Sequence, residues 1–117
     1  MGELDVIDRA VFNAVLASVG DLEFLRELIE GYFEDSPTLL AALHTALAAG
    51  NAGEFRRAAH SLKSTSASLG ATNLATLCRE LEEMGRAGAL DGAAAAIGRA
   101  EAEYARVRVA LDLAITA

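Results

Sequence analysis

The sequence predicts an all-α protein: an antiparallel up-down four-helix bundle with an additional short N-terminal helix. Alanine and leucine dominate the chain and β-branched residues are sparse, a composition that favours helix over strand. Apolar residues recur at three- and four-residue steps, the spacing of helices that each bury one face. The connections between these segments are short, and short connections join antiparallel neighbours.

The composition bounds the size and the class of protein. With 117 residues, 53% of them hydrophobic, and one proline, we expect a single helical-bundle domain over residues 1–117. A net charge of −7 argues against nucleic-acid binding, because a phosphate backbone repels that field. Neither a signal peptide nor an apolar run of membrane-spanning length is present, so we expect a cytoplasmic protein that does not enter membranes.

The first half of the chain divides at its glycines and caps. A short helix is predicted over Asp5–Ala17, and Gly20 breaks it. Asp21 is a preferred cap for the second helix. Serine before proline, at Ser36-Pro37, is compatible either with a new helix start or with a kink in a continuing one. The apolar stripe then continues to Gly50.

The second half predicts three more helices. Asn51 is a natural cap for the first of them, and Gly70 should end it. Thr72 is the expected cap of the next helix, whose end is bracketed by Gly85 and Gly88. The last helix is expected from about Leu90 to Ile115, where apolar residues alternate by threes and fours.

The helix that follows Asn51 has two chemically different faces. Its apolar stripe must face a core, whereas the opposite face turns polar and small side chains toward water. The stripe consists of Phe55, Ala59, Leu62, Ser66 and Leu69, and the polar face of Arg56, His60, Lys63, Ser64 and Ala67. An exposed imidazole with an ammonium one turn away indicates chemistry rather than packing. A neutral imidazole nitrogen is a good nucleophile toward phosphorus near neutral pH.

Residues 59–70 read Ala-His-Ser-Leu-Lys-Ser-Thr-Ser-Ala-Ser-Leu-Gly. This stretch resembles the histidine-containing phosphotransfer (HPt) domain of multistep phosphorelays, whose central pattern is a histidine followed by x-Leu-Lys-Gly and a later glycine. The chain departs from the pattern at Ser64, where the family most often has glycine. Serine is the next smallest residue with a polar tip, so close approach by a partner should survive.

The resemblance implies a role for each residue of this face. His60 would accept a phosphoryl group from the aspartyl phosphate of a receiver domain and pass it to another receiver. Lys63 would supply positive charge near the phosphoryl oxygens. The remaining positions would form or border the docking surface: Ser64, Ala67, Ser68, Gly70, Arg56 and Arg86. An intrahelical pair between Glu82 and Arg86 is the competing interpretation for Arg86.

The sequence also bears on cofactors and partners. The chain has no phosphate-binding loop and no glycine-rich nucleotide lid, so it should not phosphorylate itself from ATP. We expect no cofactor and no metal ion in the chain, with magnesium held by the receiver. His44 should lie at the surface or at the boundary of the core, and Cys78 in the core. Expected partners are receiver domains of response regulators, a hybrid histidine kinase, or both.

Two other functions remain open at this stage. One is a helical adaptor that binds receiver or other signalling domains without being phosphorylated. The other is the dimerisation-and-phosphotransfer part of a histidine kinase, which normally forms a dimer and needs an attached ATP domain. We expect a monomer, because four amphipathic stripes can close a bundle within one chain.

Overall fold

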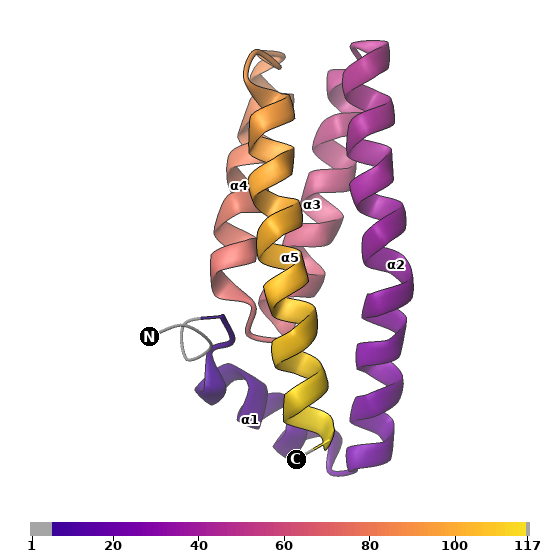
Figure 1. The fold of residues 1–117 in the computed structure, drawn as a ribbon, viewed down its shortest axis with the longest axis vertical. Helices are drawn as coiled ribbons and strands as arrows, with labels where there is room; N and C mark the ends of the chain where they lie inside the picture. The colour runs from indigo at the N-terminus through magenta and orange to yellow at the C-terminus, as the bar shows by residue number, and fades with distance from the viewer. Residues whose placement is uncertain (1–5, 117) are drawn as a thin grey trace.

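The computed structural model describes residues 6–116, and all the regular structure in them is helical. The helices are α1 (Arg9–Val19), α2 (Leu22–Ala49), α3 (Ala52–Ser68), α4 (Thr72–Ala87) and α5 (Ala93–Thr116). Figure 1 shows α2 to α5 side by side in alternating directions, with α1 at the end where α2 begins. The predicted fold class, a four-helix bundle with an additional N-terminal helix, is confirmed.

The bundle closes as a ring. Helix α3 packs against α2 and α4, and α5 packs against the other sides of the same two helices. Each long helix therefore buries one stripe toward a common centre. The largest fully buried side chains come from all four helices and include Leu25, Ile29, Leu43, Phe55, Leu62, Leu74, Leu81, Ile97 and Leu111. One polar pair joins this core, a 2.8 Å hydrogen bond between Tyr32 and Ser66.

Side-chain caps fix where three helices begin. Asp21 accepts a hydrogen bond from Glu23 N, and Asn51 accepts one from Glu54 N, which confirms both predicted caps. Helix α1 begins later than predicted, because Asp8 is its cap; Asp5 itself lies outside the described residues. The predicted Thr72 cap is wrong: Thr72 is already the first residue of α4, and its N–H is bonded to the carbonyl of Gly70.

The structure shows that α2 is not interrupted at its proline and that α5 begins later than its sequence predicts. Helix α2 continues through Pro37 without a break. The proline lies on the exposed side, so the helical hydrogen bond that it removes is not lost from the core. Helix α5 begins at Ala93 rather than near Leu90, because Gly92 has a φ of +80° and interrupts the helical path.

The turn between α3 and α4 is tied to the segment before α1. Helix α3 ends at Ser68, and Gly70 follows with a φ of +87°, as expected for a glycine just past a helix. Its carbonyl accepts a 2.7 Å hydrogen bond from Asp8 N. A Cβ at Gly70 would lie 2.8 Å from the carbonyl oxygen of Asp8, so this crossing requires glycine. The described helices include none that is both long and apolar enough to cross a membrane.

Candidate functional site

Helix α3 has the two faces that its sequence predicts. All five stripe positions, Phe55, Ala59, Leu62, Ser66 and Leu69, are buried. On the opposite side the His60 side chain is 55% exposed and the Lys63 side chain 29% exposed. The imidazole is therefore open to a partner, while the lysine stem is partly covered and its ammonium is held close to the protein.

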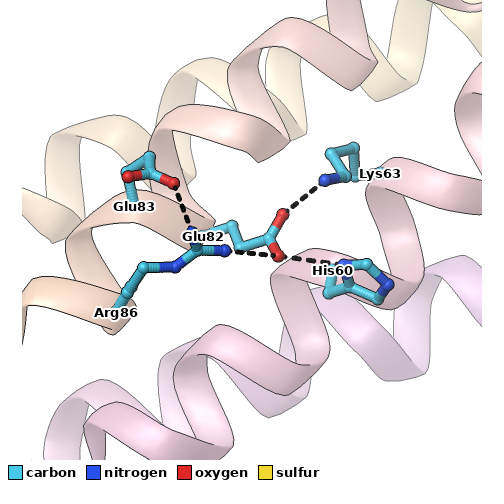
Figure 2. Close-up of polar contacts among 5 residues, drawn as sticks. All are labelled: His60, Lys63, Glu82, Glu83 and Arg86. Carbon is cyan, nitrogen blue, oxygen red and sulfur yellow. Dashed lines mark hydrogen bonds and ion pairs between the residues drawn. The ribbon is translucent and has the colours of Figure 1, made fainter.

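A carboxylate from the neighbouring helix connects these two groups. Glu82 of α4 reaches across to α3 with its side chain only 4% exposed. Its Oε2 lies 2.9 Å from His60 Nδ1 and its Oε1 2.6 Å from Lys63 Nζ. Figure 2 shows the carboxylate between the two α3 side chains, with Arg86 approaching from its own helix. The site is thus built from one turn of α3 and one turn of α4.

The charge state of Glu82 fixes which ring nitrogen of His60 carries the hydrogen. The hydrogen bond from Lys63 holds the pKa of Glu82 below its ordinary value of 4.5, against the opposing effect of burial, and His60 adds to this lowering. An ionised carboxylate can only accept hydrogen bonds, so Nδ1 of His60 must carry the hydrogen that it donates. The neutral ring then has its free electron pair on Nε2. This arrangement makes Nε2 the nucleophilic atom.

Arg86 completes the cluster at its outer edge. Its guanidinium lies 3.4 Å from Glu82 Oε2 and 3.4 Å from Glu83 Oε1. The intrahelical Glu82–Arg86 pair is therefore formed, and the same contact brings Arg86 to the border of the His60 site. The side chain is 58% exposed, so it remains accessible to an anionic group on a partner.

The other predicted site residues fall into two places. Ser64, Ala67 and Ser68 are exposed on the part of α3 that follows His60. Together with Lys63, the first two line a shallow hollow of about 350 Å³, which Ala75, Thr76 and Arg79 complete from α4. Gly70 does not reach this face, because it is buried in the turn against Asp8. Arg56 is exposed one turn before His60, with its backbone against Gly85 of α4.

Glu82 is the functional residue that the sequence reasoning missed. The sequence suggests only an intrahelical pair with Arg86 for this residue, although its position carries a further signal. Glu82 lies four residues after Cys78 and eight after Leu74, within the stripe that α4 buries. A charged residue in a buried stripe must be paired, and the nearest cations on the polar face of the preceding helix belong to the His60 site.

The remaining candidates for chemistry lie elsewhere. His44 is exposed and pairs with Glu101 at 2.9 Å, which confirms its surface position. Cys78 is buried in the core as predicted, and burial raises the pKa of its thiol to about 12. Among residues 6–116 the structure contains no group of three or more histidine, cysteine, aspartate or glutamate residues that could hold a metal ion.

A helical bundle that presents one oriented, nucleophilic imidazole beside a lysine defines the class of histidine phosphotransfer proteins. Comparison with known proteins gives the family. Residues 27–110 match the Hpt domain family, and the chain belongs to this family.

Two individual proteins show how far the similarity extends. Multistep phosphorelay regulator 1 from Schizosaccharomyces pombe is 33% identical over 89 residues, which is 74% of this chain and 30% of the relative. The chain thus spans less than a third of that protein. The crystal structure of histidine-containing phosphotransfer protein B (HptB) from Pseudomonas aeruginosa PAO1 matches with a TM-score of 0.89 and 35% identity. This match covers 95% of both chains.

Proposed function

We propose that Nε2 of His60 accepts a phosphoryl group from the aspartyl phosphate of a receiver domain and passes it to a second receiver. The observation that carries this assignment is the 2.9 Å contact between His60 Nδ1 and Glu82. It leaves Nε2 unprotonated on the exposed side of α3. Attack forms the Nε2–P bond and breaks the P–O bond to the receiver's aspartate, which departs as a carboxylate.

Glu82 supports both directions of this transfer. When Nε2 attacks phosphorus while Nδ1 keeps its hydrogen, the imidazole ring becomes positively charged. The ionised, buried carboxylate at Nδ1 stabilises that charge without further rearrangement. A positively charged ring is also a good leaving group, so the phosphoryl group can move on to the next receiver. Glu82 is in this sense a positioning residue, because it acts on phosphorus only through His60.

Lys63 supplies the positive charge at the phosphoryl group. Its ammonium lies 2.6 Å from Glu82 Oε1, next to the imidazole and partly exposed. Phosphoryl transfer depends mainly on in-line positioning and on stabilising the charge of the phosphoryl oxygens. We place the magnesium ion that such transfer uses in the acidic pocket of the receiver and not in this chain.

The partner surface is the exposed part of α3 that follows His60. Ser64, Ala67 and Ser68 have small side chains, so a receiver can bring its aspartyl phosphate close to Nε2. We expect a transient interface at the small end of the usual range, since a carrier must release both donor and acceptor. A hybrid histidine kinase could provide one of these receivers. We also propose a cytoplasmic monomer, which light scattering would distinguish from the dimer of a kinase phosphotransfer hairpin.

Transfer from phosphorylated receiver domains tests the proposal. Labelled receivers are mixed with the wild-type chain, with His60→Gln and with His44→Gln, the matched control that removes the other histidine. Label should appear on wild type and His44→Gln, be absent from His60→Gln, survive alkali and disappear in acid. Receivers that bind but transfer no label would instead support the adaptor function. Label on His60→Gln would refute the assignment of the acceptor.

A further inference from the structure

Helices α3 and α4 touch at a glycine one turn from the site. A Cβ built on Gly85 would lie 2.8 Å from the Cβ and the backbone N of Arg56, and 2.9 Å from its Cα. Contacts this short are not found for real side chains, and two of the three atoms belong to the α3 backbone. No rotation of a side chain could relieve them. At this point the two helices are as close as the absence of a side chain allows.

No other glycine within a described helix has this environment. A Cβ at Gly31 or Gly98 would meet nothing within 4 Å, and one at Gly53 would meet only Asn51 Oδ1 at 3.6 Å. Gly85 is also buried. Glycine weakens the interior of a helix relative to alanine, so the close approach of α3 explains why its presence in α4 is tolerated.

The contact lies directly beside the Glu82 bridge. Gly85 follows Glu82 by three residues on α4, and His60 follows Arg56 by four residues on α3, so the contact and the bridge are adjacent turns of one helix crossing. The two contacts of the bridge, at 2.9 Å to His60 and 2.6 Å to Lys63, both cross from α4 to α3. If the helices moved apart by several tenths of an ångström, both would lengthen together.

We propose that Gly85 is a positioning residue for phosphotransfer: it sets the separation of α3 and α4 at which the Glu82 carboxylate reaches His60 Nδ1 and Lys63 together. This inference deepens the proposed function and rests on it for its consequence. Its geometric part, the control of the His60 tautomer, concerns the unphosphorylated chain alone. It can therefore be measured without any receiver.

The test compares Gly85→Ala with Gly98→Ala, which adds the same methyl group to a helix where it meets nothing. The tautomer ratio of His60 is read from the ¹⁵N chemical shifts of the imidazole at alkaline pH. In Gly85→Ala the ratio of Nδ1–H to Nε2–H ring should fall about tenfold, as expected when a hydrogen bond to a charged group is lost. Gly98→Ala should keep the wild-type ratio. An unchanged ratio in folded Gly85→Ala would overturn the proposal.

A second variant separates spacing from stability. Glu82→Asp is shorter by one methylene, so it withdraws the carboxylate without adding an atom between the helices. It should reproduce the tautomer change, and combining it with Gly85→Ala should add little, because both remove the same interaction. If Gly85→Ala does not fold, Glu82→Asp still decides: a wild-type tautomer ratio in this variant would mean that helix spacing does not limit the bridge.

The phosphotransfer assay then separates the role of Gly85 from the proposed function. Transfer from a receiver should be slower in Gly85→Ala than in Gly98→Ala, by the factor by which the fraction of Nδ1–H rings falls, because only these rings have a free electron pair on Nε2. A tautomer change without any labelling of wild-type His60 would leave the role of Gly85 intact and overturn the proposed function. Labelling of the wild type together with an unchanged tautomer in Gly85→Ala would do the reverse.

Discussion

Replacing Glu82 with glutamine tests how much the buried carboxylate contributes to the free energy of unfolding. Glutamine has the same shape but no charge, and its amide offers one acceptor and one donor group. It can accept a hydrogen bond from His60 or from Lys63, and its NH₂ group then faces the other donor. The variant therefore loses the carboxylate charge from both hydrogen bonds. Opposed donors remain if the NH₂ group faces Lys63; if it faces His60, the ring must change tautomer so that Nδ1 accepts.

The size of the effect follows from the exposure of the partners. Hydrogen bonds to charged groups contribute about 1.5–3 kcal/mol, and the carboxylate side chain is only 4% exposed. The His60 and Lys63 side chains are 55% and 29% exposed, so water replaces part of what they lose. We expect Glu82→Gln to lower the free energy of unfolding by about 2 kcal/mol, which is less than the roughly 3–5 kcal/mol for breaking a fully buried pair.

Urea denaturation followed by circular dichroism measures this change. With a slope of about 2 kcal/mol per molar urea, the midpoint should fall by about 1 M. Glu83→Gln is the matched control, because Glu83 is the adjacent glutamate, is 60% exposed and only contacts Arg86 at 3.4 Å; its midpoint should barely move. Equal midpoints for the two variants would refute the view that the buried bridge stabilises the bundle.

Three further predictions concern Glu82, Cys78 and Lys63. Because the Lys63 hydrogen bond lowers the pKa of Glu82, this carboxylate stabilises the fold above pH 4.5 and ceases to do so as the pH falls through its folded-state pKa; urea midpoints measured across acid pH should show the advantage of wild type over Glu82→Gln disappearing. Burial raises the pKa of Cys78 to about 12, so at pH 8 a thiol reagent should react only after the bundle opens, and urea should accelerate that reaction. Lys63→Ala should slow single-turnover phosphotransfer by about 100-fold, the lower limit for removing one group that stabilises transition-state charge, because Lys63 is partly exposed; the Kd for the receiver, measured by calorimetry, should change little.

Most of the fold could be predicted because its determinants are local. The stripe of α3 and the caps Asp21 and Asn51 depend on residues within a few positions of one another, and helical periodicity is sufficient to place them. Pro37 could not be decided in the same way. A proline is compatible with a helix start and with a continuing helix, and only the packing of α2 along its whole length selects the second.

The site was predictable to a smaller extent, for a related reason. His60 and Lys63 lie on one turn of one helix, so their proximity follows from helix geometry. The bridge to Glu82 joins residues 22 positions apart and depends on the rotation and separation of two helices. The close contact between Gly85 of α4 and Arg56 of α3 likewise leaves no periodic pattern in the sequence. The prediction of Thr72 as a helix cap was wrong for a similar reason, because the tertiary contact of Gly70 with Asp8 fixes the turn before α4.

The hydrogen bond from Asp8 N to the carbonyl of Gly70, called the clamp below, ties a residue outside the family match to one inside it. A stable folding unit therefore needs wider limits than the family match. The residues that match the Hpt domain family begin at 27, yet Val6, Ile7 and Phe12 are buried in the core that the bundle shares with α1. A chain cut back to residues 27–110 would expose apolar surface at the α3–α4 turn and remove the 2.7 Å hydrogen bond from Asp8 N to the carbonyl of Gly70. Fragment design for this protein should therefore follow the clamp and keep Asp8, rather than follow the boundaries of the sequence match.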